Sequence, residues 1–137
     1  EEVPNLRVSG IADFLAAHRD PAPFCLALHS YGDKPLLVRL PLATGQPPQL
    51  ANLAVACLDH MVLAQHPSAA VMPVPSRETT LQQLASDQAQ VAFFLPSIRP
   101  EEVRAIALSR LKMPRKSTRF VPKPALGLVC RPWESSG

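Results

Sequence analysis

The residues of this sequence best suited to chemistry lie close together near its C-terminal end, in the stretch MPRKSTRFVPK. Guanidinium forks, ammonium groups and adjacent hydroxyls are the side-chain groups that bind phosphate or carboxylate. A turn adds free backbone amides as further donors. We therefore expect an anion-binding site made of six residues, Arg115, Lys116, Ser117, Thr118, Arg119 and Lys123.

The same stretch also has an interpretation without any ligand. It lacks the GxxxxGK[ST] pattern of a nucleotide-binding P-loop. Met113 and Phe120 could anchor a solvated connecting loop to the core, and this alternative stays open. Extended contact with nucleic acid is disfavoured, because aromatic residues make up 5% of the chain and stacking on bases needs them near the cations.

The positive charge of the chain is concentrated in this region. Residues 110–123 contain six Lys or Arg and no acid. The rest of the chain therefore has eight Lys or Arg (14 minus 6) and all 11 Asp and Glu. The net charge of +3 therefore indicates a local patch rather than a generally basic surface. The stretch has no helical or strand periodicity, which predicts a long loop, and long loops in compact domains often have a function.

The other polar residues form no complete catalytic or metal-binding pattern. We expect no metal site, because the spacing of the histidines is neither HxH nor HxxxH. The acidic pair Glu101 and Glu102 suits the positive end of a helix better than general acid–base work. The histidines are His18, His29, His60 and His66.

The three cysteines are Cys25, Cys57 and Cys130, an odd number with wide spacing and no CxxC. This pattern predicts buried free thiols in a reducing cytoplasm rather than disulfides or a zinc site. No stretch approaches the ~20 consecutive apolar residues of a membrane helix, so we also expect no membrane contact.

The elements that must position the basic loop are short. The pattern predicts helices over 10–18, 50–65 and 97–110, and one more that Ser76 caps. The first two strands are expected to form a hairpin, and the apolar run 90–96 predicts a strand covered on both faces. The predicted strands are 24–30, 36–40, 71–75, 90–96 and 125–131.

This order of elements predicts an α/β (α+β) fold with a mixed β-sheet of about five strands and three to four packing helices. The 137 residues suit a single domain with its own core. We assign residues 1–9 to a lead-in or linker, 10–131 to the domain and 132–137 to a tail. The long basic loop, 110–123, lies between the last predicted helix and the last predicted strand.

Residues 91–129 resemble the C-terminal signature of the bacterial domain-of-unknown-function family 1015. In that family a hydrophobic strand, a helix and an MP-x-KST-x-F-x-PK loop lead to a GLV strand, which is 127–129 here. The resemblance extends over residues 24–131, and in its upstream part Ala54 and Ser76 stand where the family usually has acids. The matching loop residues are Met113, Pro114, Lys116, Ser117, Thr118, Phe120, Pro122 and Lys123.

The resemblance implies a C-terminal half separated from an N-terminal half that carries the family's candidate catalytic motif. The lack of an initiator Met agrees with a fragment of a longer protein. We hypothesise a domain without catalysis of its own, whose loop binds a phosphate-bearing small ligand or an acidic partner surface. The ligand could be phosphate or a nucleotide, and no other cofactor is predicted.

Two alternatives to that hypothesis remain. In the first, the loop is half of a phosphotransferase or phosphohydrolase site that the missing N-terminal half completes. In the second, the domain is purely structural and pairs with that half or forms a homodimer.

Overall fold

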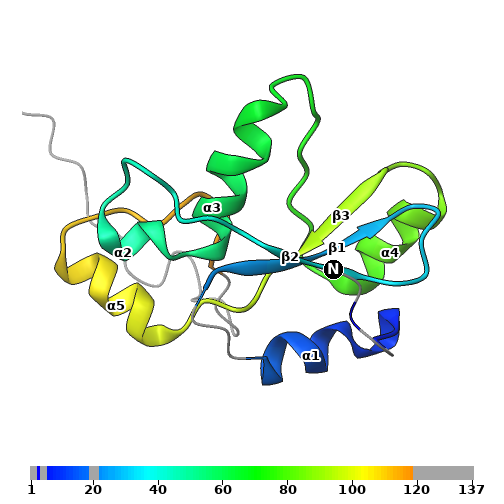
Figure 1. Cartoon of the computed structure of the whole chain (residues 1–137), viewed down its shortest axis with the longest axis horizontal. Coiled ribbons are helices and arrows are strands. Elements are labelled where there is room, and N and C mark those ends of the chain that lie inside the picture. The colour runs from blue at the N-terminus through cyan, green and yellow to red at the C-terminus, as the bar shows by residue number, and fades with distance from the viewer. Residues whose placement is uncertain (1–2, 4–5, 19–21, 119–137) are drawn as a thin grey trace, which may run out of the picture.

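A three-stranded antiparallel sheet organises the fold (Figure 1). The computed structural model describes residues 3, 6–18 and 22–118. The strands are β1 (Phe24–His29), β2 (Leu36–Arg39) and β3 (Val91–Phe94), in the order β2-β1-β3. The predicted hairpin is confirmed, since β1 and β2 are antiparallel with Phe24 opposite Arg39.

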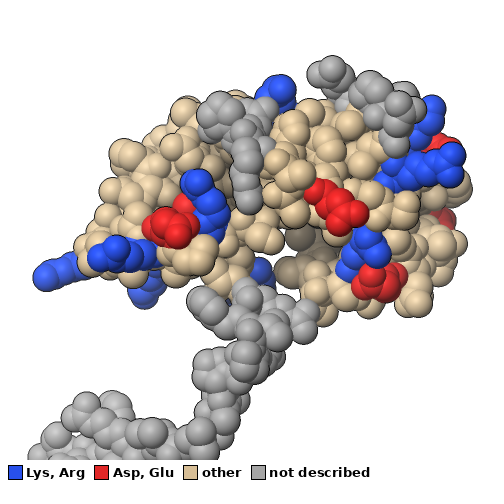
Figure 2. All heavy atoms as spheres, turned by 90° about the horizontal axis from the view of Figure 1, so that it is seen from below, with Lys and Arg blue, Asp and Glu red and all other residues tan. Residues whose placement is uncertain are grey.

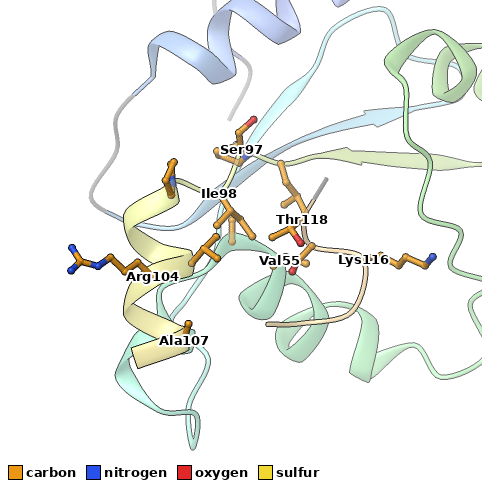
Figure 3. A pocket seen from close by; sticks show the side chains of 13 residues that line it. Val55, Ser97, Ile98, Arg104, Ala107, Lys116 and Thr118 are labelled. Atoms are coloured by element: carbon orange, nitrogen blue, oxygen red, sulfur yellow. The ribbon is translucent and has the colours of Figure 1, made fainter. Parts of the chain in front are cut away.

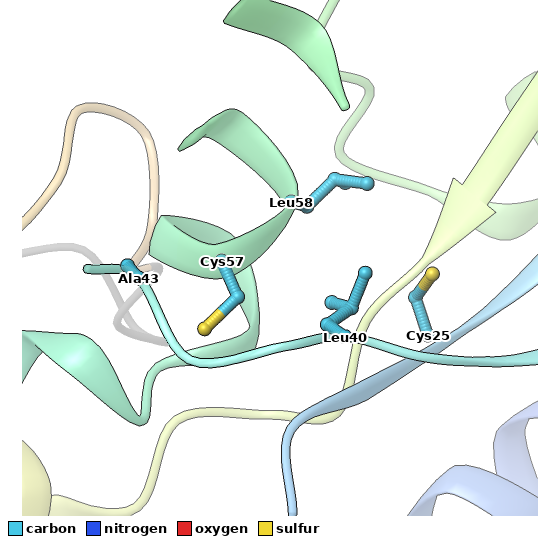
Figure 4. Packing of buried hydrophobic residues seen from close by; sticks show 5 residues of the cluster. All are labelled: Cys25, Leu40, Ala43, Cys57 and Leu58. Atoms are coloured by element: carbon cyan, nitrogen blue, oxygen red, sulfur yellow. The ribbon is translucent and has the colours of Figure 1, made fainter. Parts of the chain in front are cut away.

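Apolar side chains cover both faces of the sheet. On one face, the first core cluster joins the sheet to α3 (Ala54–Met61), and it includes Cys25, Cys57 and Leu58 (Figure 4). On the other face, Leu28 and Ala92 pack with Leu84 of α4 (Arg77–Ala85). Each fully buried large side chain is worth about 1.5–3 kcal/mol, so both clusters contribute to the stability of the fold.

The strand over 90–96 forms as β3, but it is shorter than predicted and lies at an edge of the described sheet. Its continuous apolar run does reflect contacts on both faces. Ala92 and Phe94 belong to the α4 side, whereas Phe93 and Leu95 pack on the α3 side. The strand buried between two neighbours is β1.

The expectation of a mixed sheet of about five strands is wrong for the described residues, which form three antiparallel strands. The segment 71–75 is not a strand. Pro73 and Pro75 have no N–H for a ladder, and Val71 and Met72 are exposed, so no burial rewards pairing. The predicted strand 125–131 lies outside the described residues.

The helix predicted over 50–65 is three separate segments, α2 (Pro48–Ala51), α3 and the 3-10 helix η2 (Leu63–Gln65). The break after α2 has a tertiary cause. The Ala51 carbonyl accepts hydrogen bonds from the Ala43 N–H at 3.2 Å and from the Cys57 thiol at 3.0 Å. It is therefore not available to continue the helix, and Leu53 is extended, with a ψ of 124°.

The other helix predictions are confirmed, although the described part contains five α-helices instead of three to four. A 3-10 turn, η1 (Val8–Gly10), precedes α1 (Ile11–Ala17). Ser76 caps α4, since its Oγ accepts from the Thr79 N–H at 3.1 Å. The class is thus α+β, and no helix in the described ranges is both long and apolar enough to cross a membrane.

Candidate functional site

A groove of about 600 Å³ lies between α3 and α5 (Pro100–Leu108), and residues 116–118 of the basic loop close its third side (Figure 3). Most of its lining is apolar and comes from the start of α3, the segment after β3 and one face of α5. The lining residues are Ala54, Val55, Leu95, Pro96, Ser97, Ile98, Pro100, Val103, Arg104, Ala107, Lys116, Ser117 and Thr118.

The start of α5 is fixed by local chemistry. Pro100 occupies the first turn, where its missing N–H costs nothing. The Glu102 carboxylate accepts from the Arg99 N–H at 2.7 Å and from its guanidinium at 3.2 Å. This hydrogen bond and the Glu102 charge raise the pKa of Arg99. The interpretation of Glu102 as a helix-start residue is therefore confirmed.

The end of α5 directs the chain back to the groove. Arg110 has a φ of 55°, and its N–H and that of Leu111 donate to the carbonyls of Ala107 and Ile106 at 3.0 and 3.1 Å. This pattern is a Schellman motif, which ends a helix with a left-handed residue. The described part of the loop, 111–118, then contains neither helix nor strand, as predicted.

A tight turn presents Lys116, Ser117 and Thr118. The Ser117 Oγ donates to the Pro114 carbonyl at 2.6 Å, and Lys116 has a φ of 58°. The hydroxyl proton of Ser117 thus holds the turn together rather than facing a ligand. Thr118 lies beside Val55 and Ile98 in the groove (Figure 3).

The two cations that line the groove do not converge. Figure 3 shows the Arg104 and Lys116 side chains extending from opposite sides of the groove, away from its interior. Both residues are exposed. The groove therefore offers an apolar interior between two positively charged rims, rather than a pocket in which several donors meet one anion.

Sequence reasoning missed Arg104. It lies on the face of α5 formed by Pro100, Val103 and Ala107, at the spacing of one helix face. The apolar residues of this helix indicate its buried face in the sequence, but they do not point to Arg104. The spacing of Pro100, Val103, Arg104 and Ala107 at three and four residues would have indicated that Arg104 shares a helix face with these three residues.

The structure brings three of the six predicted anion-binding residues to the groove. Arg115 is exposed and is not part of the lining, and Arg119, Phe120 and Lys123 lie outside the described residues. Met113 is half-buried, and its role as a loop anchor stays a prediction.

One face of the molecule carries charges of both signs. On the face seen in Figure 2, Lys and Arg lie next to Asp and Glu, and the described residues there form no broad area of one sign. A protein that grips a nucleic-acid backbone needs many cations aligned on one surface. This face does not offer that arrangement.

The four histidines and the two described cysteines, Cys25 and Cys57, are not among the residues that line the groove. The His18 ring stacks on Phe14, with centroids 4.7 Å apart, and meets the edge of Phe24 at 5.0 Å. Cys25 and Cys57 are buried free thiols, as predicted, and burial raises the pKa of the Cys25 thiol to about 11. No three His, Cys, Asp or Glu side chains in the described ranges gather as metal ligands would.

Comparison with known proteins gives no relative from which to transfer a function. No model of a known protein family matches the chain, and neither a curated protein nor a solved structure matches it. The likeness of residues 91–129 to family 1015 therefore rests on the motif residues themselves.

Proposed function

We propose that this domain is a binding module, without catalysis of its own, whose groove between α3 and α5 takes up an acidic partner surface. The observation that supports this proposal is the arrangement of the groove. Its interior is apolar, and its two cations, Arg104 and Lys116, stand on opposite rims.

The apolar interior supplies the affinity. Val55, Ile98 and Val103 are half-buried side chains whose remaining exposed surface faces the groove region. Covering such surface stabilises a complex by roughly 25 cal/mol per Å² before the costs of association. A partner without apolar side chains would leave this contribution unused.

The rim cations supply orientation. An exposed ion pair contributes about 0.2–1 kcal/mol, so Arg104 and Lys116 cannot by themselves hold a partner. Charges at a rim mainly raise the association rate and select the partner. Carboxylates spread over a protein surface can meet two separated cations at once, whereas one small phosphate cannot reach both rims.

A phosphate-bearing small ligand is the second candidate, and one observation favours it. The hydroxyl residues Ser97 and Thr118 line the same groove as Pro100, where α5 begins. The positive end of a helix attracts anions. In this second case, an N-terminal half could complete a phosphotransferase or phosphohydrolase site at the groove.

Membership of family 1015, a bacterial source and a cytoplasmic location are also proposals. The MP-x-KST motif supports the first two. The buried free thiols Cys25 and Cys57 support a reducing compartment. A homodimer, or pairing with the N-terminal half expected from the family, would provide the partner surface.

An NMR titration of the ¹⁵N-labelled chain tests the proposal. A peptide of alternating Leu- and Glu-rich turns should shift the amide signals of Val55, Ile98 and Thr118, and a peptide with Gln in place of Glu should do so less. Lys116→Glu should weaken the binding of the acidic peptide, whereas Lys34→Glu, an exposed change in the β1–β2 turn, should leave the binding unchanged.

The same titration decides between the two candidates. Inorganic phosphate and ATP are added to separate samples as probes. If either anion shifts the groove signals at millimolar concentration while neither peptide does, the second candidate replaces the first. If the peptide shifts map away from the groove, the proposed partner site is wrong.

A further inference from the structure

We infer that the partner segment which enters the groove is an amphipathic α-helix with acidic residues beside its apolar strip. This inference rests on the proposed function, because it names the conformation of the acidic partner. It is argued from hydrogen bonding, from the walls of the groove and from the positions of the rim charges.

Hydrogen bonding disfavours an extended partner segment. An extended chain brings one unpaired N–H and one unpaired C=O per residue, and both need partners when they are buried. Apart from the Ser97 and Thr118 hydroxyls, which are too few for a whole backbone segment, the groove interior consists mainly of Val, Ile, Leu, Ala and Pro side chains, which have none to offer. The Ser117 hydroxyl is already committed to the Pro114 carbonyl.

Strand addition along the groove is disfavoured for a related reason. The segment that follows β3 and lines the groove, 95–98, contains Pro96. A proline nitrogen has no hydrogen, so this segment cannot present an unbroken ladder to an added strand. A helix satisfies its own backbone groups and can therefore lie on an apolar surface.

The walls and size of the groove suit a helix. Two of its sides are the helices α3 and α5, as Figure 3 shows. A groove between helices accepts apolar side chains from successive turns of a third helix, at positions i, i+3, i+4 and i+7. The volume of about 600 Å³ is within the range of about 300–1,000 Å³ of sites that enclose a drug-sized group, which a few such side chains match.

The charges lie where the flanks of that helix would be. Arg104 is on the α5 rim and Lys116 is on the loop rim, with the apolar interior between them. A helix that buries one apolar strip exposes the positions on either side of it, as in a coiled coil. Glu or Asp on both flanks would face the two cations at the same time.

The test measures the fluorescence anisotropy of three labelled peptides with the full chain. The first is an acidic amphipathic helix of Leu, Ala and Glu. The second has the same composition in an order that removes the apolar strip, and the third is the first with a central proline. We expect the first to bind at least about tenfold more tightly than the others, equal to about 1.4 kcal/mol.

Variants of the chain locate the binding. Val55→Glu places a charge in the groove and should weaken the binding of the helical peptide about tenfold or more. An unchanged circular dichroism spectrum of the free protein shows that the variant is still folded. Gln65→Glu, which adds the same charge at an exposed position of η2, is the matched control and should leave the affinity unaltered. Equal effects of the two substitutions would overturn the inference.

The outcomes separate the inference from the proposed function. If all three acidic peptides bind equally at the groove, the partner is acidic but need not be helical, and the inference alone fails. If none of them binds, both fail. Nuclear Overhauser contacts between the groove and residues 119–137 of the free chain would also overturn the inference, since the chain itself would then occupy the groove.

Discussion

The position of α5, and with it one wall of the groove, depends on a single buried side chain. Ile106 is 1% exposed and is the one α5 residue classed as buried in the described structure, whereas Leu108 on the same helix is 73% exposed. Ile106→Ala removes three methyl or methylene groups, worth about 2.4 kcal/mol at about 0.8 kcal/mol each. The cavity left behind raises the expected loss of stability to about 3–4 kcal/mol.

Urea unfolding followed by circular dichroism measures this loss. Ile106→Val should cost about 0.5–1.5 kcal/mol, which gives a graded series. Leu108→Ala is the matched control, and it should change the free energy of unfolding by less than about 0.5 kcal/mol because its side chain already contacts water. If Ile106→Ala costs no more than Leu108→Ala, α5 does not pack as described and the groove has no fixed wall.

Three further predictions concern parts of the fold outside the groove. Asp87 follows α4 with a left-handed φ of 56°, so Asp87→Gly should raise the free energy of unfolding by about 0.5–1 kcal/mol, measured by urea unfolding. Asp87→Ala should bring no such gain. Ser76→Ala should cost about 1 kcal/mol through loss of the α4 cap, and Ser86→Ala at the other end of the helix should cost less in the same assay. Burial raises the pKa of the Cys25 thiol from 9.0 to about 11. Between these two pH values the folded state therefore binds more protons than the unfolded state, and the free energy of unfolding should fall as the pH rises from 9.0 to about 11. Cys25→Ala should lack this component of the pH dependence, and parallel pH profiles of the two proteins would contradict the burial of the thiol.

Local signals in the sequence correctly predicted several elements. The hairpin follows from two apolar runs around a Gly and Pro turn, and the α4 start follows from a serine whose hydroxyl can cap it. The start of α5 follows from Pro100 and the two glutamates after it. Each of these features depends on residues a few positions apart, so the chemistry that forms them is visible in the order of the amino acids.

Contacts between distant residues decided what the sequence did not reveal. The helix predicted over 50–65 is broken because the Ala51 carbonyl bonds to the Ala43 N–H, from a segment outside the helix. The segment 71–75 has strand-like residues, but no neighbour buries Val71 or Met72, and it stays irregular. Periodicity cannot report either effect, because it records only how residues repeat along one segment.

The residue types at the candidate site, a cluster of cations and hydroxyls in a loop that follows a helix, can be read directly from the order of the amino acids. What those residues can do depends on the folded structure. It places Lys116 and Arg104 on opposite rims of an apolar groove and uses the Ser117 hydroxyl within its own turn. Side-chain direction depends on the backbone conformation of Lys116 and on the packing of α5 against the rest of the fold, and the loop residues alone encode neither.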